Sequence, residues 1–105
     1  MDAAALEADA DAAAAARNYG LARELLLRAT TANADRFDLW LKLSAMCRAT
    51  GDPAAALAAT DRALAIQPLD FMALLIRATQ LEALANTDRA GQAYGHALEI
   101  GRAHV

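Results

Sequence analysis

A repeat of 34 residues constrains the fold of this chain more than any other feature. The segment GDPAAALAATDRALAIQP, residues 51–68, returns downstream in altered form as NTDRAGQAYGHALEIGR, residues 86–102. Small side chains recur at two positions of every copy: Ala22 and Ala29, Ala56 and Ala63, and Ala90 and Ala97. A period of this length is typical of arrays of helical hairpins. Three copies would fill the chain as a single domain, with units at about 3–36, 37–70 and 71–104.

Each unit has the composition and the turn signals of two helices. Alanine, the strongest helix former, accounts for 31 of the 105 residues, whereas β-branched and aromatic residues are scarce. Gly51 suits a left-handed helix end, Asp52 can cap the next helix and Pro53 suits its first turn. Asn86 to Asp88 is expected to cap the last helix in the same way. We predict an all-α chain with helices near 3–16, 20–33, 38–50, 53–66, 71–84 and 88–101.

The middle unit resembles a tetratricopeptide repeat. The family residues W, L, G, Y, A, F, A and P correspond here to Trp40, Leu43, Ser44, Cys47, Ala56, Thr60, Ala63 and Pro68. The third unit matches at Leu74, Ala78, Leu81, Ala90, Tyr94 and Ala97, and the first, more loosely, at Leu6, Ala10, Ala22, Leu26 and Ala29. The resemblance implies three tandem helix-turn-helix units that stack as a right-handed superhelical solenoid.

The resemblance also implies a concave groove, lined by the first helix of each unit, that holds a peptide or a protein domain. The candidate groove residues are Glu7 and Asp11 in the first unit, Asp38, Leu41, Lys42 and Arg48 in the second, and Met72, Leu75, Ile76 and Thr79 in the third. Such a groove would suit an amphipathic helix or an apolar strand, with a basic residue near Glu7 and Asp11. Alternatively, Leu75 and Ile76 pack between helices and the acids form a solvated face.

One subclass of the family grips the C-terminal carboxylate of chaperones with Lys, Asn and Arg side chains. In this chain Glu7 and Asp11 stand where that clamp needs Lys and Asn. Met72 and Ile76 stand where it needs Lys and Arg. Repulsion would replace attraction, so the sequence argues against a chaperone-tail adaptor.

Other functional classes lack their sequence signatures. A net charge of −3 without a Lys or Arg cluster argues against nucleic-acid binding. His96 and His104 have no carboxylate or cysteine at ligand spacing, so we expect no metal site and no cofactor. Ser44 lacks a nearby histidine base and Cys47 occupies a packing position, so the chain alone shows no catalytic constellation. The sequence shows no signal peptide and no long apolar stretch, so we expect no membrane association. It has no cysteine pair, so we expect a cytoplasmic setting.

Arg77 stands where the family usually has a buried Leu. It could form an ion pair with Glu82 or Asp70, extend its guanidinium to solvent, or reach a ligand. We favour the ion pair.

The end of the third unit is expected to be uncovered, because arrays of this family usually close with an extra helix. Tyr94, Leu98 and Ile100 would then need a cover. A second copy of the chain would supply it in a homodimer. A downstream domain would supply it if these residues are the N-terminal part of a longer chain, which is the reading we favour.

The segments FMALL and RAGQAYGHAL are also similar, more weakly, to the repeat region that precedes the catalytic domain of bacterial aspartyl/asparaginyl β-hydroxylases. That resemblance implies a downstream 2-oxoglutarate- and iron-dependent domain, for which this region would be an accessory domain. Three hypotheses therefore stand: a protein- or peptide-binding scaffold, which we prefer, an accessory domain of such an enzyme, and a self-associating structural module.

Overall fold

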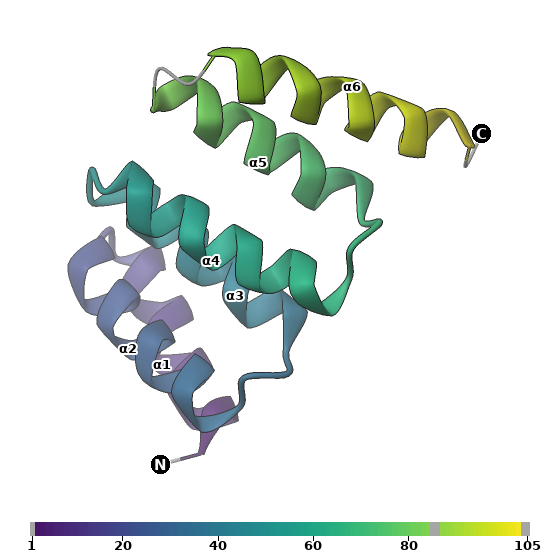
Figure 1. The fold of residues 1–105 in the computed structure, drawn as a ribbon. Helices are drawn as coiled ribbons and strands as arrows, with labels where there is room; N and C mark the ends of the chain where they lie inside the picture. The colour runs from purple at the N-terminus through teal and green to yellow at the C-terminus, as the bar shows by residue number, and fades with distance from the viewer. Residues whose placement is uncertain (1, 85–86, 104–105) are drawn as a thin grey trace.

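The fold is an array of three helical hairpins, seen in a computed structural model that describes residues 2–84 and 87–103, with the side chains of 87–91 left out. The helices are α1 (Ala3–Ala15), α2 (Tyr19–Ala32), α3 (Phe37–Ala49), α4 (Pro53–Ile66), α5 (Phe71–Ala83) and α6 (Thr87–Ala103). Each hairpin packs on the next in chain order (Figure 1). The all-α prediction is confirmed.

The sequence repeat is also a repeat of backbone structure. The first helices of the hairpins begin at residues 3, 37 and 71, and the second helices begin at residues 19, 53 and 87. The turns inside the first two hairpins use the same geometry: Arg17 and Gly51 are left-handed, with φ of 61° and 78°. The following residue, Asn18 or Asp52, returns its backbone N–H to a carbonyl of the preceding helix at 2.8 and 2.9 Å. These bonds satisfy carbonyls that a helix end would otherwise leave unpaired.

Side-chain caps begin four of the helices. The carboxylates of Asp2, Asp52 and Asp70 and the amide oxygen of Asn18 each accept the backbone N–H three residues further along. Pro53 lies in the first turn of α4, as the sequence predicts. The expected cap at the start of α6 involves Asn86, which lies outside the described residues.

Small side chains let the paired helices approach closely. Ala22, Ala29, Ala56, Ala63 and Ala97 are fully buried, and all five occupy the repeated alanine positions. Leu39 and Leu81 are the largest side chains that are completely enclosed. The core is therefore a thin layer between helices that runs along the array, as expected for a solenoid.

The first helices of the hairpins adjoin one another on one face of the array, and the second helices adjoin one another on a different face. Polar contacts join the first helices α1 and α3, and the first helices α3 and α5 border a small cavity. The second helices α2 and α4 border a larger cavity, and they lie nearer the viewer than α1 and α3 in Figure 1. Any ligand surface of this chain must therefore be assigned to one of these two faces.

Candidate functional site

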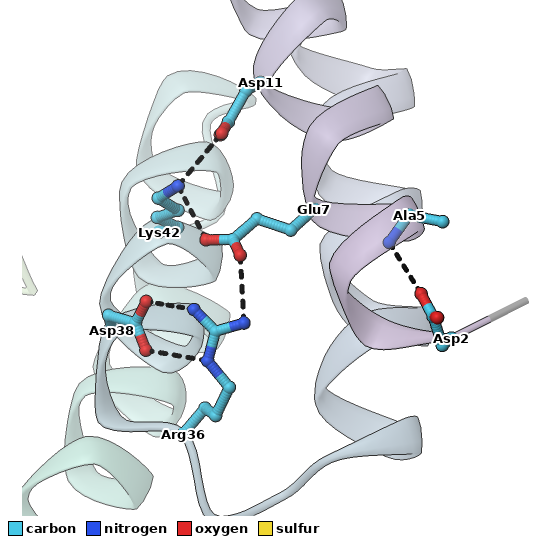
Figure 2. A network of polar contacts seen from close by, with 7 residues as sticks. All are labelled: Asp2, Ala5, Glu7, Asp11, Arg36, Asp38 and Lys42. Carbon is cyan, nitrogen blue, oxygen red and sulfur yellow. Dashed lines mark hydrogen bonds and ion pairs between the residues drawn. The ribbon is translucent and has the colours of Figure 1, made fainter.

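A network of ion pairs joins α1 to the start of α3 (Figure 2). Lys42 Nζ donates to Glu7 Oε2 at 2.8 Å and to the two carboxylate oxygens of Asp11 at 3.0 and 3.1 Å. Arg36 donates to Glu7 Oε1 at 2.9 Å and holds Asp38 with two of its nitrogens. Three of the candidate groove acids are thus bound to two cations of the same chain.

These contacts change the acidity of the groups involved. Hydrogen bonds from Lys42, and then from Arg36, hold the pKa of the Glu7 carboxyl below its usual value. The bond to Glu7 is the main cause that raises the pKa of Lys42, and Arg36 lowers the pKa of Asp38. Glu7 and Asp11 were expected to attract a basic residue of a ligand. The chain itself supplies those cations, so most of the negative charge at this end of the face is already paired internally, with three carboxylates bound to two cations.

Candidate residues of the second and third units meet between α3 and α5. Leu41 and Arg48 of α3 and Ile76 of α5 line a cavity of about 60 Å³ together with Ser44, Ala45 and Gln80. Leu75, the residue before Ile76, is half-buried, whereas Met72 is 60% exposed. The spacing of Met72, Leu75 and Ile76 places them on one side of α5.

Polar contacts tie Thr79 to the last helix. Its hydroxyl donates to the Leu75 carbonyl at 3.0 Å and lies 3.2 Å from the Tyr94 hydroxyl, which also donates to Glu82 at 2.8 Å. Tyr94, one of the residues expected on an uncovered end face, is half-buried by these neighbours. Leu98 is 53% exposed and Ile100 is half-buried.

A buried polar cluster lies behind the α3–α5 cavity, and sequence reasoning missed it. Ser44 Oγ donates to the Ala56 carbonyl at 2.9 Å, lies 2.7 Å from Thr60 Oγ1 and accepts from Gln80 Nε2 at 2.6 Å. Gln80 is only 3% exposed, and its Oε1 has no hydrogen-bond partner within the described part of the chain. Small hydroxyl residues where the family has Gly and Phe, at positions 44 and 60, were the available signal.

Arg77 forms an ion pair, but with a different partner from those expected. Its Nε donates to Asp61 Oδ1 of α4 at 2.7 Å, instead of to Glu82 or Asp70. Asp61 lies 16 positions away, in the preceding helix hairpin, so its proximity is a result of packing that local spacing does not reveal.

The candidate chemical groups of the sequence are dispersed. Cys47 is buried, and this burial raises the pKa of its thiol, which disfavours the reactive thiolate. His96 is exposed, and His104 lies outside the described residues. Over residues 2–84 and 87–103, no three His, Cys, Asp or Glu side chains gather closely enough to hold a metal ion. Within the same ranges, no helix has the length and apolar character needed to span a membrane.

Three stacked hairpins with these packing positions define a tetratricopeptide-repeat solenoid, as the sequence predicted. A crystal structure of MamA superposes with a TM-score of 0.92 over 99% of this chain and 61% of its own, at 22% identity. The first tetratricopeptide domain of Spaghetti (RPAP3), bound to an HSP90 peptide, gives 0.84 over 94% and 79%, at 18% identity. The Sgt2 domain from Aspergillus fumigatus gives 0.81 over 94% and 66%, at 20% identity.

At these identities the likeness establishes the fold alone, and this chain spans less than two thirds of the MamA structure. No protein-family model and no curated protein matches the chain. The similarity to the repeat region of aspartyl/asparaginyl β-hydroxylases therefore stays a prediction.

Proposed function

We propose that this chain is a scaffold that binds a protein or peptide along the face formed by α1, α3 and α5. The observation that carries the proposal is the cavity between α3 and α5, where Leu41, Arg48 and Ile76 come together from two consecutive repeats. Side chains that converge in this way give a ligand an apolar contact and a cation at one place. A solved domain of the same fold, that of Spaghetti, is bound to a peptide, which supports a peptide as the ligand class.

The apolar half of this face favours a ligand that presents apolar side chains, either as an amphipathic helix or as an extended strand. Met72, Leu75 and Ile76 supply a continuous apolar strip along α5. The other half adds little net charge, because Lys42 and Arg36 already bind Glu7, Asp11 and Asp38. Binding is therefore expected to depend mainly on apolar burial at the third repeat.

The test selects ligands for the purified chain from a displayed peptide library and measures their affinity for a Leu75→Asp variant. A charge in the apolar strip is expected to weaken binding by about tenfold or more, since the ligand would bury it unpaired. Far-UV circular dichroism should show unchanged helicity. Leu69→Asp, at an exposed position of the turn between α4 and α5, is the matched control and should bind normally.

Two results would count against this groove. If Leu75→Asp unfolds the chain, Leu75 belongs to the core, and Met72→Asp then tests the same face at a more exposed position. If both variants fold and bind as the unchanged chain does, the ligand lies elsewhere.

Self-association through α6 is the second candidate function. The exposed Leu98 supports it, because a large apolar side chain near the end of the array gains by being covered. Tyr94 and Ile100 would belong to the same contact, made either with a second copy or with a downstream domain.

A further inference from the structure

A second and larger cavity lies on another side of α3 from the proposed groove. It has a volume of about 230 Å³ and is bordered by α2 and α4, with Trp40, Leu43 and Cys47 of α3 as its floor. These three side chains point to a different side of α3 from Leu41 and Arg48, as their helical spacing requires. Leu27 of α2, which is 54% exposed, stands at its edge.

One of the two arginines at this cavity has no counter-charge in the described part of the chain. Arg62 of α4 places its guanidinium 4.8 Å from the centre of the Trp40 ring. Arg62 forms no ion pair with any residue in the described ranges. Arg23, on the α2 side, is already bound to Asp52 at 2.9 Å and to Thr50 at 3.0 Å. An apolar floor therefore lies beside one guanidinium whose charge is not neutralised.

The next crevice along the array shows that the repeat itself does not require this combination. A cavity of about 240 Å³, lined by Leu74, Arg77, Gln92, Ala93 and His96, lies 34 positions further on. In the repeat register, Arg77 corresponds to Leu43 and Asp61 corresponds to Leu27. Arg77 and Asp61 form an ion pair with each other. The cavity lined by Leu74 and Arg77 thus has its charges paired, whereas the α2–α4 cavity exposes apolar surface and the charge of Arg62.

We propose that the α2–α4 cavity is a second binding site, which takes one bulky apolar side chain of an acidic partner segment while a neighbouring carboxylate of that segment binds Arg62. Apolar burial against Trp40, Leu43 and Leu27 supplies the attraction, and the carboxylate gives the guanidinium the counter-charge it lacks. A segment with Lys or Arg beside the apolar residue is repelled. The site is separate from the proposed groove, so the chain can hold two partners on its two faces.

Trp40 provides a direct readout, because it is the only tryptophan of the chain and forms the floor of the cavity. The probes are blocked heptapeptides with one central Phe or Leu flanked by Asp, and matched peptides with Asn or Lys in place of Asp. The Asp peptides are expected to change Trp40 fluorescence saturably. The Asn peptides should bind about tenfold more weakly, since they lack the ion pair, and the Lys peptides should show no saturable change.

Variants locate the bound peptide. Ala58→Phe fills the cavity from an exposed position of α4 and should abolish the fluorescence change. Gln92→Phe, at the corresponding position of the cavity lined by Leu74 and Arg77, is the control and should bind normally. Arg62→Gln should reduce the affinity for the Asp peptides to that for the Asn peptides, and Arg62→Glu should make the Lys peptides the better ligands.

Three outcomes would overturn the proposal: equal affinity for Asp and Asn peptides, no effect of Ala58→Phe, or a loss of binding in Leu75→Asp, which would place the peptide in the α3–α5 groove. The last outcome would support the groove while removing this second site. Failure of the groove test, conversely, leaves the Trp40 measurement unaffected.

Discussion

At the scale of single residues, the turns inside the first two hairpins each hold one left-handed residue, and the two turns use different residue types for it. Gly51 adopts φ of 78° without a side chain to clash, whereas Arg17 adopts φ of 61° in the equivalent turn. A residue with a β-carbon is disfavoured in this conformation by about 1–2 kcal/mol. The first turn is therefore the less stable version of the same structure.

Replacing Arg17 with glycine is expected to stabilise the fold. The removed strain exceeds the extra entropy of glycine in the unfolded chain, so Arg17→Gly should raise the free energy of unfolding by about 0.5–1 kcal/mol. Urea unfolding followed by circular dichroism measures the change. Gly51→Ala is the reciprocal variant and should lower the free energy of unfolding by about 1 kcal/mol. A destabilised Arg17→Gly would show that its side chain makes a contact that outweighs the strain.

At the scale of helices, the contact between α1 and α3 depends on charge as well as on apolar packing. Glu7 is the centre of this contact, since it binds both Lys42 and Arg36 and is less exposed than either cation. Its lowered pKa means that the ionised form is favoured by folding. The resulting stability is fully present above the usual pKa of Glu and is lost as the pH falls through the lower pKa of the folded state.

The Glu7→Gln variant tests this contribution. It should lower the free energy of unfolding by about 1 kcal/mol at pH 7, a value discounted for the exposure of its partners. The difference from the unchanged chain should shrink as the pH falls from the usual pKa of Glu through the lower pKa of the folded state, because below the latter Glu7 is protonated in both states. Denaturant unfolding at a series of pH values, from 7 down into the acid range, measures the change. Asp9→Asn, at an exposed position of the same helix, is the control and should leave the free energy of unfolding at pH 7 nearly unchanged. A difference that stays constant over the whole pH series would mean that Glu7 acts through packing.

At the scale of the whole molecule, the array has two long faces and an end, and each offers a different contact. The groove of α1, α3 and α5, the cavity between α2 and α4, and the exposed Leu98 of α6 are separate surfaces. Their separation allows substitutions that affect one surface and spare the others.

Self-association belongs to this scale. If α6 forms the contact, sedimentation velocity should detect a dimer whose fraction rises with protein concentration, and Leu98→Asp should shift the mixture toward monomer by about tenfold in dissociation constant. Leu21→Asp is the control, since Leu21 is an exposed leucine of α2, in the first hairpin. A monomer at every concentration would remove the second candidate function.

Local patterns in the sequence were enough to predict the helices and their stacking. The 34-residue period, the alanine positions and the caps at Asp52 and Pro53 act within a few residues or recur at a fixed interval, so one chain reveals them. The prediction of an all-α solenoid is confirmed for the same reason. The positions of Leu41, Arg48 and Ile76 near one another also followed from the family register, because both helices repeat the same orientation.

Only the packed structure decides which charged and polar groups meet. Arg77 binds Asp61 of the preceding hairpin. Lys42 and Arg36 form ion pairs with Glu7, which the sequence predicted to attract a basic residue of a ligand. The pairing of Ser44 with Gln80 and the cavity beneath Arg62 are equally invisible along the chain. The physical reason is that the energy of a charge or hydrogen bond depends on distances of a few ångströms between separate helices. Those distances are set by how closely the alanine-lined hairpins pack, and no local spacing encodes them.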